Sequence, residues 1–140
     1  GAEALIECLQ RLLDGEPLDA QPQAGSEITY AKKLEKAEAQ IDWADSAELL
    51  ERRIRAFNPW PVAWCMVASE RIRIWRACLI CEDHQELPGT VLKAGKQGID
   101  IATGKQVLRL LELQRPGKRR MSAADYLNAT RLPDRLDHKP

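Results

Sequence analysis

The sequence predicts a mainly β protein with flanking helices, in which a small five-stranded barrel follows a linker and a detached N-terminal helix. Five short apolar runs, separated by turn residues, succeed one another between residues 63 and 113. Apolar residues recur at helical spacing near the N-terminus and again over residues 47–57. A chain of 140 residues has room for one compact core, because single domains usually contain about 100 to 150 residues.

The first predicted element is an amphipathic helix over residues 3–13. Its apolar side chains form one stripe: Leu5, Ile6, Leu9, Leu12 and Leu13. Gly15 and Pro17 end the pattern, and residues 16–44 are predicted to be a linker. The apolar stripe finds no local partner in residues 16–29, and the chain begins at Gly1 instead of Met. We therefore expect a fragment whose first helix, within residues 1–15, belongs to a domain that is missing here.

A second helix is predicted to begin at Asp45 or Ser46, either of which can serve as the N-cap. Glu48 follows Asp45 by three residues, the spacing of a capping box. Pro59 and Pro61 prevent continuation of this helix, because each lacks an amide hydrogen.

Five strands are predicted next: residues 63–67, 71–80, 89–92, 98–103 and 107–113. Apolar residues become adjacent within residues 72–75, where a β-bulge would restore the inward-facing side. Bends of this kind help a small sheet to close into a barrel. A short last helix follows over residues 122–128, with Ser122 and Asp125 at capping-box spacing, and residues 131–140 form a polar tail.

Charge is divided unevenly along the chain. Residues 1–50 contain 4 basic and 11 acidic side chains, whereas residues 51–140 contain 17 and 10, so the net charges are −7 and +7. A basic region of this kind attracts polyanions, which favours nucleic acid as the partner. No apolar run approaches the roughly 18 residues that a membrane span needs, and the N-terminus carries no secretion signal. We expect a cytoplasmic protein that does not bind membranes.

The densest basic cluster surrounds Pro116 and Gly117, in what we predict to be a mobile loop after the last strand. It contains four cations: Arg115, Lys118, Arg119 and Arg120. A cation that neutralises a phosphate releases counterions, which gives salt-dependent and largely sequence-independent affinity. A merely solvated loop explains this cluster equally well by itself. The net charge of the same region and the barrel favour RNA, since small five-stranded barrels often bind oligonucleotides.

Motifs for catalysis or metal binding are weak. Cys78, Cys81 and His84 resemble half of a zinc site, but no fourth ligand is evident, and residues three apart on a strand point to opposite faces. The glycine-containing stretches 89–96 and 98–105 have the wrong spacing for a phosphate-binding loop. We predict no catalytic residue and no metal site in this chain.

Several segments together point to a known family. Residues 29–34 (TYAKKL), 38–43 (EAQIDW) and 55–61 (RAFNPWP) are accompanied by further motifs within 88–104 and 116–128. They resemble the C-terminal portion of bacterial methionyl-tRNA formyltransferases, and the match extends from the linker to the last helix.

The resemblance implies an oligonucleotide-binding-like (OB-like), tRNA-binding C-terminal domain over residues 45–130. The helix within residues 1–15 would be the last helix of a missing N-terminal catalytic domain. The parent enzyme would transfer a formyl group from 10-formyltetrahydrofolate to the amino group of methionine on initiator tRNA. Folate and chemistry would belong to the missing domain, so the fragment alone is expected to be inactive, monomeric and able to bind tRNA without strong discrimination.

Seven cations are the candidate RNA contacts. Lys33 and Lys118 fall within matched motifs, and five more are chosen from charge and loop position: Lys93, Lys96, Arg115, Arg119 and Arg120. Two alternatives stay open. A related formyltransferase that acts on a sugar nucleotide, or one that processes formyltetrahydrofolate, would share the barrel and residues 59–61, although residues 29–43 and 117–128 favour the tRNA enzyme. A stand-alone RNA-binding or protein-interaction module is disfavoured by the unpaired apolar stripe of the first helix.

Overall fold

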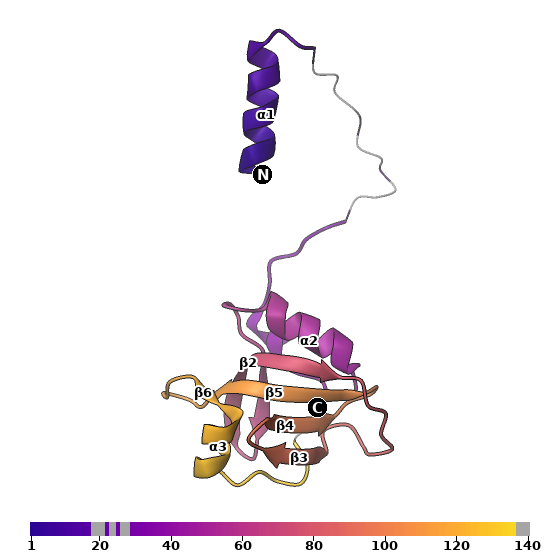
Figure 1. The fold of residues 1–140 in the computed structure, drawn as a ribbon, viewed down its shortest axis with the longest axis vertical. Coiled ribbons are helices and arrows are strands. Elements are labelled where there is room, and N and C mark those ends of the chain that lie inside the picture. The colour runs from indigo at the N-terminus through magenta and orange to yellow at the C-terminus, as the bar shows by residue number, and fades with distance from the viewer. Residues whose placement is uncertain (18–21, 23–24, 26–28, 137–140) are drawn as a thin grey trace. The chain divides into compact units, whose positions relative to one another are not determined.

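The computed structural model describes residues 1–17, 22, 25 and 29–136, and the chain divides into two compact units, Gly1–Lys33 and Leu34–Pro140 (Figure 1). Helix α1 (Ala2–Leu13) belongs to the first unit and matches the predicted helix. None of its residues is buried, and Leu13 is 81% exposed. Much of the predicted linker between residues 17 and 29 lies outside the described residues.

The second unit begins earlier than predicted. Residues 34–44, assigned from sequence to the linker, contain the short 3-10 helix η2 (Lys36–Ala39) and the buried side chains of Ile41 and Trp43. The amide of Ile41 donates a hydrogen bond to the carbonyl oxygen of Trp64 at 2.8 Å. This segment packs with the domain because alternate apolar residues enter the core while the backbone bonds to a neighbouring strand.

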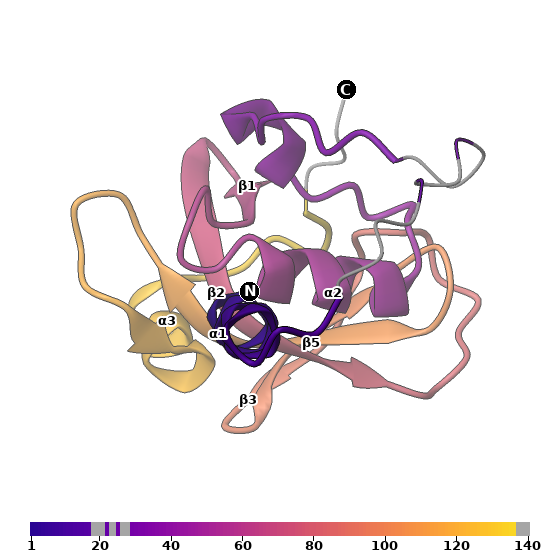
Figure 2. The same cartoon turned by 90° about the horizontal axis from the view of Figure 1, so that it is seen from above.

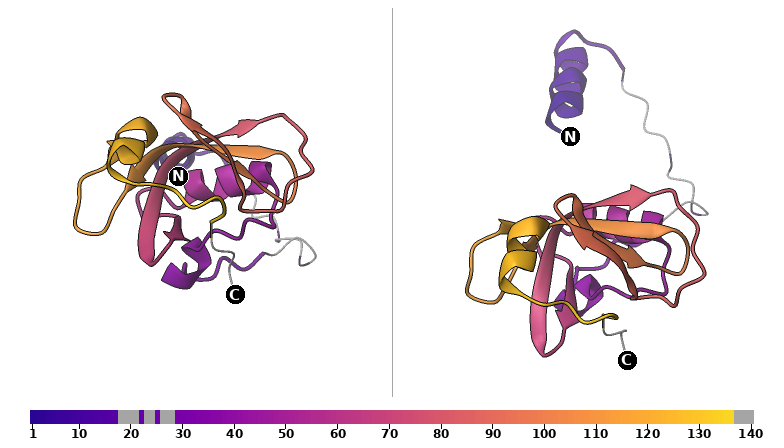
Figure 3. Two further views of the ribbon diagram at one scale, coloured as in Figure 1. Left: turned by 90° about the horizontal axis from the view of Figure 1, so that it is seen from below. Right: turned by 60° about the horizontal axis from the view of Figure 1, so that its bottom comes forward.

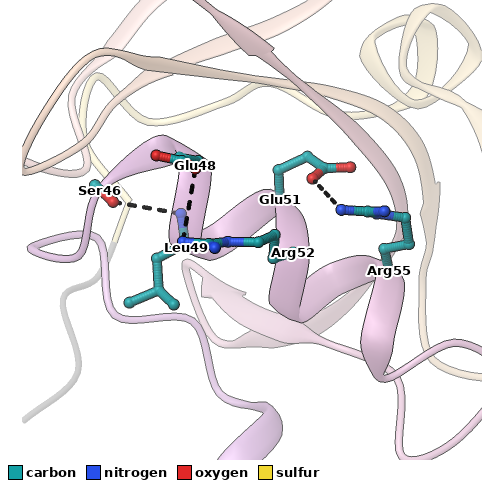
Figure 4. A network of polar contacts seen from close by, with 6 residues as sticks. All are labelled: Ser46, Glu48, Leu49, Glu51, Arg52 and Arg55. Atoms are coloured by element: carbon teal, nitrogen blue, oxygen red, sulfur yellow. Dashed lines mark hydrogen bonds and ion pairs between the residues drawn. The ribbon is translucent and has the colours of Figure 1, made fainter.

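Helix α2 (Ala47–Ala56) begins at Ser46, whose hydroxyl oxygen accepts a hydrogen bond from the Leu49 amide at 3.3 Å (Figure 4). Of the two predicted caps, Ser46 is therefore the one used, because its oxygen satisfies an amide that has no partner within the helix. Leu50 and Ile54 are buried, and together with Ala47 they form the face that enters the core.

Substitution Ser46→Ala should lower the free energy of unfolding by about 1 kcal/mol, because the Leu49 amide loses its acceptor. Urea denaturation of both proteins measures the difference. Ser69→Ala, in the exposed turn before β2, is the matched control and should change stability by less than about 0.5 kcal/mol. Equal effects of the two substitutions would show that the cap contributes nothing.

The five predicted strands form one antiparallel half-barrel sheet in the order β1-β2-β5-β4-β3 (Figures 1 and 2). Their bounds are Trp64–Val67 (β1), Glu70–Ile80 (β2), Val91–Gly95 (β3), Gly98–Ala102 (β4) and Val107–Gln114 (β5). A sixth strand, β6 (Met121–Ser122), pairs with β5 and was not predicted. The fold class predicted from sequence, an OB-like mainly β domain with flanking helices, is confirmed.

The predicted β-bulge in β2 is confirmed. The register between β2 and β5 shifts between Ile74 and Arg76 and again between Arg76 and Ala77. Before the shift, Ile72 and Ile74 are buried whereas Arg71 and Arg73 are exposed. The first half of β2 therefore presents arginines to solvent from a strand that is anchored in the core.

The core lies between the sheet and α2, which packs against β2 and β5, and α3 (Ala123–Ala129) contacts β3 and β5 (Figures 2 and 3). The tail of residues 131–140, predicted to be polar, contains a buried side chain in its first part. Leu136 is buried, and its amide bonds to the carbonyl oxygen of Gly89 at 2.9 Å. Residues 137–140 lie outside the described residues. Among the helices described, none has the length and apolar character needed to cross a lipid bilayer.

Candidate nucleic-acid interface

The loop of residues 115–120 connects β5 to β6 and projects from the end of the sheet (Figure 3). The side-chain amide of Gln114 donates a hydrogen bond to the Lys118 carbonyl oxygen at 2.7 Å. The Lys118 amide donates to the Arg115 carbonyl oxygen at 3.1 Å, and Gly117 adopts the left-handed conformation, with φ of 68°, that closes this turn. The loop predicted to be mobile is thus tied to the strand from which it emerges.

Arg115, one of the predicted contacts, is held by a carboxylate. Its Nε lies 3.0 Å from Oε2 of Glu70, and its Nη2 lies 2.8 Å from Oε1 of the same residue. This two-point hydrogen bond, followed by the attraction between the two charges, lowers the pKa of Glu70 and raises that of Arg115. The charge of Arg115 is therefore balanced by Glu70 before any ligand binds.

Arg120 is stacked on an aromatic ring. Its guanidinium carbon lies 3.2 Å from the centroid of Trp75, whose indole N–H donates to Oε1 of Gln114 at 2.8 Å. A guanidinium over an indole face is attracted by the negative face of the ring. Lys118 and Arg119 are exposed and form no ion pair within the described part of the chain.

Two arginines of β2 join this loop, and the sequence prediction missed both. Arg71 and Arg73 line a cleft of 310 Å³ together with residues of the loop: Gln114, Arg115, Pro116 and Gly117. The guanidinium of Arg71 lies over the Trp64 ring, 3.9 Å from its centroid. The alternation Arg71-Ile72-Arg73-Ile74 could have revealed them, because period two on a strand places both arginines on the solvent side.

Lys93 and Lys96 form a separate group. Both are exposed, on β3 and on the turn that follows it, and they line a hollow of 130 Å³ with Asp100 and Arg109. Arg109 donates two hydrogen bonds to Asp100, at 2.6 and 2.8 Å. Since β5 and β4 lie between β2 and β3 in the sheet, the structure does not bring these lysines to the cleft.

Lys33 is exposed at the end of the first unit. The six other predicted contacts all belong to the second unit.

The arginines of α2 all have acidic partners. Arg52 lies 3.7 Å from Glu48 and Arg55 lies 3.1 Å from Glu51 (Figure 4). Arg53 pairs with Asp45, 2.6 Å away, just before the helix. The positive charge of this helix is locally balanced, which leaves β2 and the loop of residues 115–120 as the stronger candidates for an anion.

The structure does not support a zinc site at Cys78, Cys81 and His84 within the described residues. Cys81 is exposed, and Cys78 is half-buried on β2. Nε2 of His84 lies 2.9 Å from the Gln106 carbonyl oxygen and 3.3 Å from the Thr103 amide nitrogen, so this ring contacts the turn between β4 and β5. Within the described residues, no group of three or more His, Cys, Asp or Glu side chains is placed to hold a metal ion.

Comparison with known proteins places this geometry in a family. Residues 33–131 match the family described as formyl transferase, C-terminal domain. The chain is 53% identical over 131 residues to a methionyl-tRNA formyltransferase of Xanthomonas campestris pv. campestris (strain 8004), which covers 94% of this chain and 43% of that protein. It is 49% identical over 132 residues to the methionyl-tRNA formyltransferase of Nitrosococcus oceani, with 94% and 41% covered. The chain spans less than half the length of these relatives.

Solved structures agree on the fold. HypX from Aquifex aeolicus in complex with tetrahydrofolic acid superposes with a TM-score of 0.64 at 18% identity, covering 98% of this chain and 26% of that chain. A HypX variant gives a TM-score of 0.65 at 21% identity, covering 91% and 22%. These similarities concern the fold, whereas the family match and the two relatives concern ancestry. The chain belongs to the formyl transferase C-terminal domain family.

Proposed function

We propose that this chain is the tRNA-binding C-terminal part of a methionyl-tRNA formyltransferase. The observation that carries the proposal is a group of exposed cations that form no ion pair with any described residue, in a chain 53% identical to a relative of that name. These cations come from β2 and from the loop of residues 115–120: Arg71, Arg73, Lys118, Arg119 and Arg120. Guanidinium groups suit phosphate because they present several N–H donors in one plane.

In the parent enzyme, a formyl group would pass from 10-formyltetrahydrofolate to the amino group of methionine on initiator tRNA in the cytoplasm. We assign folate binding and chemistry to an N-terminal domain outside this chain. The basic residues described here would hold the body of the tRNA, as part of a monomeric enzyme. Such tethering raises the effective concentration of the acceptor end at a distant reaction centre.

Phosphate contacts position a nucleic acid without reading its sequence. We therefore expect similar affinities for initiator and elongator tRNAs, with initiator identity recognised by the part of the enzyme that lies outside this chain. The seven contacts predicted from sequence stay candidates. Among them, Arg115 lines the cleft, and Lys118, Arg119 and Arg120 follow the lining residues Pro116 and Gly117 in the same loop. Arg71 and Arg73 also line the cleft and are added to the set.

The purified chain should bind both classes of tRNA with an affinity that falls steeply between about 50 and 200 mM salt. For each phosphate neutralised, the logarithm of the association constant should fall by about 0.7 to 0.9 per tenfold rise in salt. Fluorescence anisotropy with labelled tRNAs measures the slope. Arg119→Gln should weaken binding several-fold, whereas Arg52→Gln, which removes the same charge from a pair on α2, should have a smaller effect. Affinity that is equal at low and high salt would refute the proposal.

A further inference from the structure

We infer that the cleft lined by Arg71, Arg73 and Arg115 holds one backbone phosphate of RNA, and that Glu70 competes with this phosphate for Arg115. The inference rests on the proposed function and names a site within the proposed surface. It also gives an acidic residue a role in setting the affinity.

The cleft has the composition of an anion site. Three arginines line its 310 Å³, together with Gln114, Pro116 and Gly117, and no acidic residue is among these described lining residues. Arg73 lies opposite Gln114 in the register of β2 and β5, and Arg71 lies two residues away on the same side of β2. Two of the three cations therefore project from a paired strand, which limits how far they can move from the cleft.

Arg71 is oriented by its aromatic neighbour. Its guanidinium lies over the face of Trp64 at 3.9 Å, and the Trp64 indole nitrogen is 3.5 Å from the Lys36 carbonyl oxygen. Stacking uses the flat face of a guanidinium and leaves the N–H donors at its edge available. An anion in the cleft can therefore receive hydrogen bonds from Arg71 without disturbing the stack.

Arg115 is the cleft cation that forms an ion pair with Glu70. Only Nε and Nη2 of Arg115 donate to the carboxylate, so part of its five N–H donors stays available. The side chain of Glu70 is 45% exposed and that of Arg115 is 31% exposed. Solvent weakens a pair with this exposure, so a phosphate that also meets Arg71 and Arg73 can displace the carboxylate.

This exchange has a consequence for salt dependence. When a phosphate takes Arg115 from Glu70, the phosphate releases a counterion, but the freed carboxylate attracts one, so the net release is close to zero. If the carboxylate is absent, the same contact gives a net release. Removal of the Glu70 charge should therefore steepen the salt dependence by about 0.7 to 0.9 logarithmic units and tighten binding at low salt about threefold to tenfold.

The test measures tRNA binding as a function of salt for the wild-type chain and two pairs of variants. Glu70→Gln keeps the shape of the side chain and one acceptor for Arg115, and Glu86→Gln removes an equal charge from an exposed loop outside the cleft. Arg73→Gln removes a cleft cation, and Arg76→Gln removes an exposed cation of the same strand that does not line the cleft. Thermal unfolding confirms that each variant is folded.

We expect Glu70→Gln to bind more tightly and with a steeper salt slope than Glu86→Gln, and Arg73→Gln to lose about tenfold in affinity against about twofold for Arg76→Gln. Weaker binding by Glu70→Gln would overturn competition, because it would make Glu70 a group that orients Arg115. Equal effects within each pair, with salt-dependent wild-type binding, would remove the site and leave the proposed function standing. Absence of wild-type binding at low salt would refute the proposed function itself.

Discussion

Substitution Gly104→Ala is expected to lower the free energy of unfolding by about 3 kcal/mol, because the new methyl group would overlap main-chain atoms. A Cβ at this position would clash with the Ala44 carbonyl oxygen and lie 2.7 Å from the Ala44 carbonyl carbon. The Gly104 amide also donates to the carbonyl oxygens of Trp43 and Asp45, at 2.9 and 3.0 Å. Relief of the overlap would separate the turn after β4 from the segment that carries Trp43 into the core.

Urea denaturation measures this effect, and Gly95→Ala is its control. A Cβ at Gly95 meets no atom within 4 Å, so the control should differ from wild type by less than about 0.5 kcal/mol. Both changes add one methyl group, so a difference between them isolates the close approach of Gly104 to Ala44. If Gly104→Ala matched the control, the packing of residues 43–45 against the turn would be wrong.

Substitution Arg109→Met should be comparably destabilising, by about 3 kcal/mol, because it leaves a buried carboxylate without its charged partner. Asp100 is 7% exposed and accepts both hydrogen bonds of the pair. Every residue of β4 is buried, and the side chain of Asp100 borders the small hollow that it shares with Lys93 and Lys96. The methionine replaces most of the aliphatic stem of Arg109, so the loss arises mainly from the stranded charge.

A double-mutant cycle separates the pair from its members. Asp100→Asn should cost less than Arg109→Met, because the side chain of Arg109 is 21% exposed against 10% for Asp100 and can reach solvent when unpaired. The double variant should recover part of the stability lost in Arg109→Met. Arg52→Met, at an exposed pair on α2, is the control and should cost less than about 0.5 kcal/mol. An equal cost for Arg109→Met and Arg52→Met would contradict this account.

Local signals predicted much of the fold. Helix α2 follows from the spacing of Leu50 and Ile54 and from its cap, and the bulge in β2 follows from adjacent apolar residues. Three features escaped prediction: the packing of residues 34–44, the short strand β6 and the burial of Leu136. Each depends on partners that lie far away in sequence, such as the Trp64 carbonyl for Ile41 or the Gly89 carbonyl for Leu136. Periodicity carries no information about such partners.

In the candidate site too, local features were predicted from sequence and contacts between distant segments were not. The cations around Pro116 and Gly117 were visible as a run in the sequence, but the two arginines of β2 become their neighbours only through strand pairing. A count of charges along the sequence does not distinguish Arg115 and Arg120 from Lys118. The structure distinguishes them, because Glu70 lies 45 positions before Arg115, and Trp75 is supplied to Arg120 by another strand.

The hydrogen bond from the Gln114 side chain to the Lys118 carbonyl oxygen has a consequence for the entropy of anion binding at this loop. An unrestrained loop would have to be immobilised by its ligand, at about 0.5 to 1.5 kcal/mol for each long side chain that becomes fixed. In this domain the turn is already closed and Arg120 is already stacked on Trp75. Much of this loss of side-chain entropy therefore occurs during folding and not during binding. Capture of a polyanion would then proceed as a near rigid-body collision, with a small entropic barrier.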